Sequence, residues 1–186
     1  SIQSWMTGGS SEDLVLVVGN RGMGKTTILN SLAKRLGPSS IVHRATPKTT
    51  DLDNFYSFLS EILKAPIKSV RDVEKLDESL TEKTVLILDD IQNFILGKIG
   101  GFEVYNAFVE VLSLRTRNLF WCLSVNSRSW AFLKGSLGQE HLYGKVIELL
   151  PWRDFEIQNL ILKRHDISGF KREFHQSIKA YGASGD

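Results

Sequence analysis

Glycines, a lysine and two threonines follow a short apolar run at a spacing that suits the binding of phosphate. The stretch VVGNRGMGKTTIL spans residues 17–29, and Gly19, Gly24, Lys25 and Thr26 give it the pattern G-x-x-x-x-G-K-[S/T]. Glycines let the backbone curl so that several N–H groups point into one anion-binding hollow. The helix that we expect to begin at Lys25 directs the positive end of its dipole at the same place. The residues expected to contact a bound nucleotide here are Gly19, Asn20, Arg21, Gly22, Met23, Gly24, Lys25, Thr26 and Thr27.

Two aspartates end a second apolar run and are the candidate partners of this loop. Residues 85–90 read VLILDD, which places Asp89 and Asp90 at the carboxyl end of a buried strand, where ligands bind in open α/β sheets. We expect Thr26 and Asp89 to hold Mg²⁺ through their oxygens, and Lys25 to reach the β- and γ-phosphates. Asp90 occupies the place at which hydrolytic P-loop proteins often carry a glutamate that orients the attacking water. For the aspartate pair alone a solvated turn is an equally good interpretation, and the loop 64 positions upstream (25 to 89) favours the catalytic one.

Polar residues also end a later apolar run, in the stretch SVNSRSW. Asn126 is the expected sensor of the γ-phosphate, because an amide can bind both a phosphate oxygen and the attacking water. The alternative for Asn126 is a helix N-cap or a turn residue. Arg128 could reach the phosphate or a neighbouring subunit, and its alternative is a solvated surface arginine. The expected catalytic residues are therefore Lys25, Asp90 and Asn126.

Apolar runs alternate with helical patterns along the chain, which predicts a parallel sheet covered on both faces. The expected strands are 14–18, 41–45, 84–90, 118–127 and 145–150. The expected helices are 25–36, 52–63, 70–83, 102–116, a short one in RSWAFLKG, 151–165 with Pro151 in its first turn, and 171–182. Residues 1–13 are expected to form a polar, irregular extension.

Composition limits the classes of partner and compartment. The net charge of +2 gives no support for nucleic acid or for an acidic membrane surface. One cysteine, Cys122, rules out an intrachain disulfide, and the four histidines lack metal-ligand spacing. No apolar run approaches the ~20 residues of a membrane helix, and no signal peptide is recognisable. We therefore expect a cytoplasmic protein, while a membrane anchor in a longer chain stays open.

The order of these motifs resembles that of ATPases of the AAA+ superfamily and their STAND relatives. The resemblance covers about residues 14–165 and rests on the loop, LILDD, the polar-tipped strand and LPWRDFEIQNLILKRH. It implies a P-loop NTPase three-layer α/β sandwich with five parallel strands in the order 5-1-4-3-2 and the start of a C-terminal helical lid.

The resemblance also implies a domain division and cofactors. Residues 1–13 would be an extension, 14–150 the nucleotide-binding domain, and 151–186 the beginning of the lid, not completed within this chain. ATP and Mg²⁺ would be bound, with Pro151 and Trp152 beside the adenine. Homo-oligomers would form in the full-length protein, with an arginine supplied across the interface. The paired aspartates are similar to those of STAND signalling ATPases.

Four functions remain open at this point. The favoured one is an ATP-binding and slowly hydrolysing module that serves as a nucleotide-dependent switch or assembly motor. The second is a DNA-associated motor or loader of the origin-binding or transposition type, which the net charge does not support. The third is a nucleotide-binding interaction domain with little hydrolysis, and the fourth is a small-molecule kinase, for which the arginine-rich lid is not recognisable.

Overall fold

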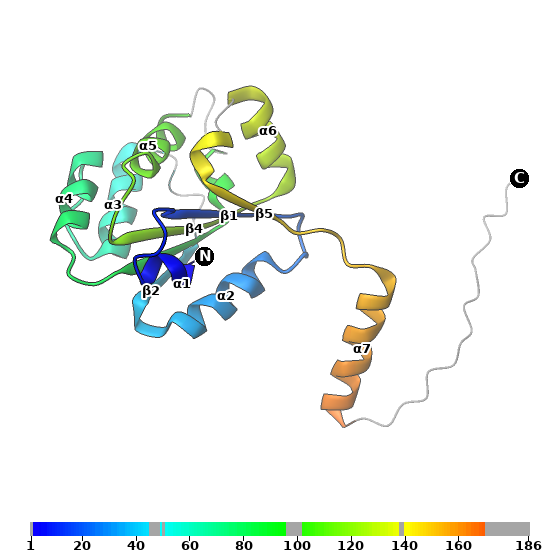
Figure 1. Ribbon diagram of the computed structural model, residues 1–186. Coiled ribbons are helices and arrows are strands. Elements are labelled where there is room, and N and C mark those ends of the chain that lie inside the picture. The colour runs from blue at the N-terminus through cyan, green and yellow to red at the C-terminus, as the bar shows by residue number, and fades with distance from the viewer. Residues whose placement is uncertain (1, 45–48, 50, 96–101, 138–139, 170–186) are drawn as a thin grey trace, which may run out of the picture. The chain divides into compact units, whose positions relative to one another are not determined.

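Five short strands form one parallel sheet whose carboxyl ends meet at a single edge (Figure 1). The computed structural model describes residues 2–44, 49, 51–95, 102–137 and 140–169. The strand order is β2-β3-β4-β1-β5, which confirms the predicted order 5-1-4-3-2 and the P-loop α/β class. The strands are β1 (Leu14–Val18), β2 (Ser40–Arg44), β3 (Thr84–Asp89), β4 (Leu119–Val125) and β5 (Lys145–Glu148).

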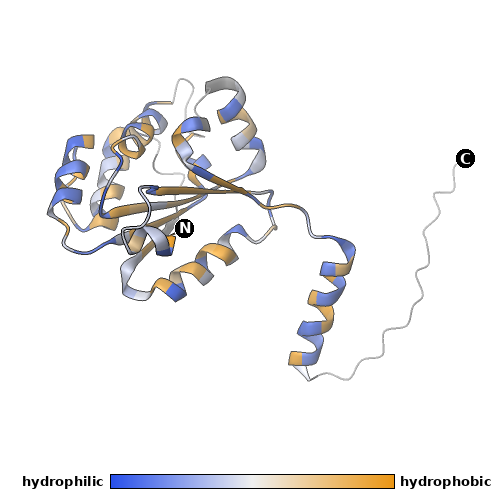
Figure 2. Cartoon of the chain, in the orientation of Figure 1, coloured by the Kyte–Doolittle hydropathy of each residue, from blue (hydrophilic) through white to orange (hydrophobic). Residues whose placement is uncertain are grey.

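Helices cover both faces of the sheet, because successive side chains of a strand point to opposite faces. Leu14, Leu16 and Val18 of β1 belong to one apolar cluster, and Val15 and Val17 belong to another. The first cluster packs under α3 (Leu52–Leu63), α4 (Val70–Ser79), α5 (Glu103–Leu112) and α6 (Ser127–Leu137), and the second under α1 (Ile2–Met6) and α2 (Lys25–Leu36). Figure 2 shows the central strands β1 and β4 as largely apolar bands, as expected for strands that are buried on both faces.

The N-terminal residues differ from the prediction, because an irregular extension was expected and Ile2–Met6 form the helix α1. Trp5 is buried, and its ring packs edge-on against the ring of Phe120, with 5.2 Å between the two ring centres. The Lys83 ammonium lies 4.6 Å from the centre of the Trp5 ring and also donates a hydrogen bond to the Trp5 carbonyl. Trp5, together with the partly buried Ile2 and Met6, therefore packs this segment against the apolar cluster on one face of the sheet.

Three helices differ from their expected bounds by three residues or more. The helices α4 and α5 each end four residues earlier than predicted, because Leu80 is extended and Arg115 has a φ of 48°. The chain divides into two compact units, 1–150 and 151–186, and the helix α7 (Asp154–Ser168) of the second unit begins three residues after Pro151. Its start is fixed by Glu156, whose carboxylate accepts a hydrogen bond from the Arg153 N–H at 2.7 Å. The predicted helix 171–182 lies outside the described residues.

Two further features bear on the chemistry and environment of the chain. Cys122 is buried in β4, as predicted, and burial raises the pKa of its thiol to about 12, so it is inert at neutral pH. Within the described part of the chain, the structure has no helix that is both long enough and apolar enough to cross a membrane.

The carboxylate of Asp77 joins α4 to the amino end of β4. Asp77 is 6% exposed, and its oxygens accept hydrogen bonds from the backbone N–H groups of Arg117, Asn118 and Leu119 at 2.8–2.9 Å. The side chain of Asn118 returns a bond to the Asp77 carbonyl at 2.9 Å. This interaction sets where β4 enters the sheet, two residues before the first ladder pair of β4 with β1.

We expect Asp77→Ala to lower the free energy of unfolding by about 3 kcal/mol, since a hydrogen bond to a charged group contributes about 1.5–3 kcal/mol and water can replace only part of the loss. Glu78→Ala, at the exposed neighbouring position of α4, is the matched control. Chemical denaturation of both variants measures the difference. Equal stabilities of the two variants would show that Asp77 does not hold β4.

Candidate nucleotide-binding site

The loop between β1 and α2 takes a shape that only glycine adopts easily. Gly22 and Gly24 have φ angles of +85° and +90°, in the left-handed region that other residues rarely occupy. At Gly19 the constraint is space, because a Cβ atom there would lie 3.1 Å from the Cβ of Leu149. The sequence pattern of the loop is thus explained by backbone conformation at two positions and by close packing at a third.

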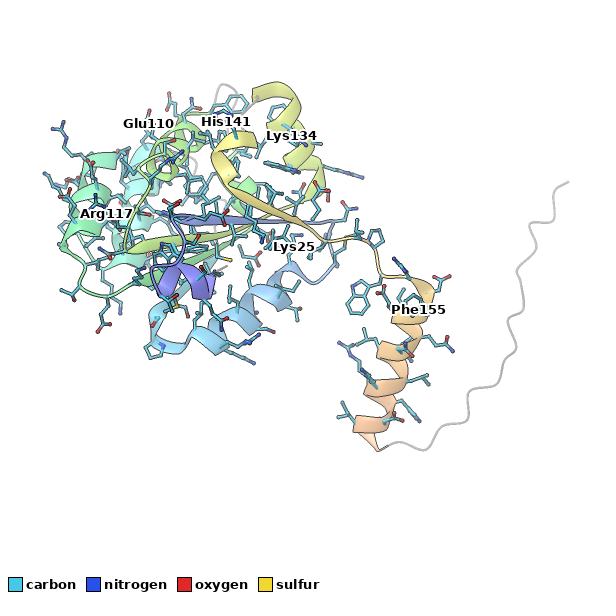
Figure 3. The ribbon with its side chains drawn as sticks, viewed as in Figure 1. Lys25, Glu110, Arg117, Lys134, His141 and Phe155 are labelled. Carbon is cyan, nitrogen blue, oxygen red and sulfur yellow. The ribbon has the colours of Figure 1, made fainter. Side chains whose placement is uncertain are left out.

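Lys25 begins α2 at the carboxyl end of β1 (Figure 3). Its side chain is 8% exposed, and its ammonium donates hydrogen bonds to the carbonyls of Gly19 at 2.8 Å and of Asn20 at 3.2 Å. The lysine therefore folds back over its own loop and places its positive charge among the loop's backbone groups. A charge held in this position suits the recognition of a phosphate.

Asp89 is buried at the end of β3 and joins three elements. Its Oδ2 accepts a hydrogen bond from the Thr26 hydroxyl of α2 at 2.6 Å, and its Oδ1 accepts one from the Ser124 hydroxyl of β4. Ser124 Oγ also accepts the backbone N–H of Asp90 at 3.0 Å. The structure thus brings together Thr26 and Asp89, which the sequence places 63 residues apart.

A second set of contacts joins Asp90 to the end of β4. Gln92 donates from Nε2 to Asp90 Oδ1 at 2.9 Å and accepts the Asn126 N–H at Oε1 at 3.2 Å. The Asn126 Oδ1 accepts the N–H of Ser129 at 2.7 Å and so caps α6. The side-chain oxygen of Asn126 therefore acts as the helix cap that was the alternative for this residue. Its Nδ2 has no hydrogen-bond partner among the described residues.

A cavity of about 570 Å³ opens over these groups, within the range of small-ligand sites. The residues that line it are Arg21, Gly22, Gly24, Lys25, Thr26, Thr27, Asp90, Gln92 and Asn126. Sequence reasoning assigned no role to Gln92 or Ser124, and the only available signal was their spacing of two residues from Asp90 and Asn126. Pro151 and Trp152 belong to the other compact unit, so their role beside the adenine stays a prediction.

The residues fit a nucleotide and a divalent cation. The loop offers glycine backbone in the conformation that turns N–H groups inward, and the start of α2 lies at the same point. The Thr26 hydroxyl and the Asp89 carboxylate, 2.6 Å apart, are the hard oxygen ligands that Mg²⁺ prefers. Among the described residues, no three His, Cys, Asp or Glu side chains are grouped so that they could hold a metal ion by themselves.

The fold and this loop define a P-loop nucleotide-binding protein of the AAA+ type. The family model described as AAA domain matches residues 8–125, more than half of the chain, and the chain belongs to that family. No curated protein matches the sequence.

Solved structures with the same fold include three archaeal and bacterial proteins. The ORC2 protein of Aeropyrum pernix, solved as ADPNP–ADP complexes, has a TM-score of 0.65 at 16% identity over 89% of this chain and 49% of its own. The Walker-type ATPase of Pyrococcus abyssi has a TM-score of 0.57 at 12% identity, over 87% of this chain and 55% of its own. RuvB of Thermotoga maritima, the Holliday junction branch migration motor, has a TM-score of 0.51 at 20% identity, over 90% of this chain and 47% of its own. The chain thus spans about half the length of these structures.

The two possible roles of Asn126 can be separated by two substitutions. We expect Asn126→Ala to lower stability by about 1 kcal/mol through the lost cap, and Asn126→Asp to preserve stability because aspartate caps equally well. Asn126→Asp removes the amide N–H₂ and adds a negative charge, so we expect it to slow single-turnover ATP hydrolysis. Thermal unfolding and hydrolysis of both variants test this. Wild-type hydrolysis by the Asn126→Asp protein would leave Asn126 as a helix cap alone.

Proposed function

We propose that this chain is an ATP-binding and slowly hydrolysing AAA+ module that acts as a nucleotide-dependent switch or assembly motor. The observation that carries the proposal is the hydrogen bond between Thr26 and Asp89, beside Lys25 and the glycine loop. A metal-binding pair next to a phosphate-binding charge is the combination that a phosphoryl-transfer site needs. AAA+ membership supports the same reaction class.

In this proposal, each of the expected site residues has a distinct task. The loop backbone and Lys25 bind the β- and γ-phosphates, and Thr26 and Asp89 hold Mg²⁺. The bound cation would neutralise part of the negative charge of the phosphates. Asp90 accepts a hydrogen bond from the attacking water and orients it, and the Asn126 amide binds the water or a phosphate oxygen. Pro151 and Trp152 cover the adenine.

Slow hydrolysis follows from what the site offers. Asp90 is one methylene shorter than the glutamate at this place in many hydrolytic P-loop proteins, so its carboxylate reaches less far. No arginine of the described residues other than Arg21 lines the cavity. An arginine supplied by a neighbouring molecule raises phosphoryl-transfer rates by about 10³–10⁵. These features favour a switch whose turnover depends on assembly into homo-oligomers.

A DNA-associated motor is the second candidate. The likeness to RuvB, a Holliday junction branch migration motor, favours it, and the chain's net charge of +2 does not. ATP hydrolysis measured with and without duplex and single-stranded DNA separates the two candidates. Stimulation by DNA supports the motor, and an unchanged rate supports the switch.

Substitutions of the two aspartates are expected to impair different steps. Asp89→Asn weakens Mg²⁺-dependent ATP binding because a metal ligand loses its charge, whereas Asp90→Asn leaves binding intact and slows hydrolysis. Lys25→Ala, which removes the phosphate-facing charge, serves as the reference for lost binding. Nucleotide titrations with and without Mg²⁺, followed by single-turnover rates, measure the split. Wild-type turnover by both aspartate variants would refute the roles assigned to them.

Hydrolysis per protomer is expected to rise with protein concentration, from a rate well below the median enzyme turnover of roughly 10 per second. Arg128, exposed at the start of α6, is the candidate arginine in trans. Arg128→Ala should flatten the concentration dependence, and Arg71→Ala, an exposed change on α4, should not. A fast rate that stays constant on dilution, with a protein that remains monomeric, would contradict the assembly-dependent switch.

A further inference from the structure

Gln92 is a buried polar side chain that sequence reasoning and the proposed reaction leave without a task. It lies in the 3₁₀ turn Ile91–Phe94 directly after Asp90 and is 9% exposed. Both ends of its amide are used, because Nε2 donates to Asp90 Oδ1 and Oε1 accepts the N–H of Asn126. Burying an amide costs free energy unless its groups are bonded, and here each end meets a different functional residue.

The two partners fix the orientation of the amide. Only the nitrogen can donate to the Asp90 carboxylate, and only the oxygen can accept from a backbone N–H, so a single orientation satisfies both. The backbone of Asp90 is also fixed, with φ 60° and ψ 49°, a left-handed conformation that is uncommon outside glycine. Its N–H donates to Ser124 Oγ at 3.0 Å. The backbone of Asp90 is therefore fixed by β4, and its carboxylate is fixed by Gln92.

We propose that Gln92 is a positioning residue, which holds the Asp90 carboxylate in place at the cavity and ties it to the end of β4 at Asn126. The inference rests on the proposed function, since it concerns how the water-orienting carboxylate is aimed. Without this contact, the side chain of Asp90 would be free to turn between rotamers. Gln92 acts through Asp90 and does not itself bind the phosphate.

Gln92→Glu isolates this contact. The substitution keeps the shape of the side chain and an oxygen for the Asn126 N–H, and it replaces the donor that faces Asp90 with a second carboxylate oxygen. We expect kcat to fall about tenfold or more with ATP affinity changed less than twofold. Gln3→Glu, the same chemical change on the exposed N-terminal helix and outside the cavity lining, is the matched control.

A double-mutant cycle with Asp90→Asn shows whether Gln92 works through Asp90. In the Asp90→Asn background, Gln92→Glu should cause no further loss of rate, because the residue being positioned is already gone. The double variant carries the amide at position 90 and the carboxylate at position 92, so the same hydrogen bond can form with donor and acceptor exchanged. It should therefore regain part of the thermal stability that Gln92→Glu alone loses, whereas Asp90→Asn alone keeps an oxygen that can accept from Gln92. Rate losses that multiply would overturn the proposal, since Gln92 would then act independently of Asp90.

The stability arm needs no turnover and keeps the two proposals apart. Additive changes in the unfolding temperature would show that Gln92 and Asp90 are not coupled and would overturn the positioning proposal, whatever the rates. Suppose that the stabilities of the variants are coupled but the wild-type protein hydrolyses no ATP at any protein concentration. The contact would then be supported and the proposed function overturned. A loss of ATP affinity that equals the loss of kcat would also overturn the positioning role.

Discussion

The buried carboxylate of Asp89 is the constraint on which the rest of the site depends. A carboxylate away from water is costly unless hydrogen bonds compensate it. Each of its oxygens accepts a hydrogen bond from a hydroxyl group, one from Thr26 at the start of α2 and one from Ser124 in β4. The helix that follows the phosphate loop and two neighbouring strands are thereby joined at one point. A shift of any one of them would break a hydrogen bond to this buried carboxylate, which favours a fixed arrangement of the three elements.

The strand order makes this meeting possible. β4 lies between β1 and β3, so the end of the P-loop strand and the end of the aspartate strand both neighbour the tip of β4. Val17 is level with Ser124 in one ladder, and Leu88 is level with Leu123 in the other. Parallel strands place all their carboxyl ends on one edge, and there the side chains beyond the last apolar residues converge. Contacts between residues 26, 89, 90, 124 and 126 follow from that topology.

Much of this could be predicted from the sequence, because the signals were local. Continuous apolar runs predicted the strands, and the glycine spacing predicted a loop whose φ angles do require glycine at Gly22 and Gly24. The strand order came from the resemblance of the motifs. Helix ends were less predictable, since Arg115 and Leu80 leave the helical conformation without glycine or proline. Trp5 was missed because its partners, Phe120 and Lys83, are distant in sequence. Gln92 was missed for the same reason, since its bond to Asn126 crosses 34 positions.

The two alternatives for Asn126, a helix cap and a phosphate sensor, are compatible in this geometry. An asparagine side chain carries an acceptor and a donor on separate atoms, and the cap uses only the acceptor. The cap holds the amide plane still, because turning it would break the bond to the N–H of Ser129. The backbone N–H of the same residue is held by Gln92, whose other end holds Asp90. Asp90 and Asn126 therefore line one cavity from a single hydrogen-bonded unit, and the start of α6 belongs to that unit as well.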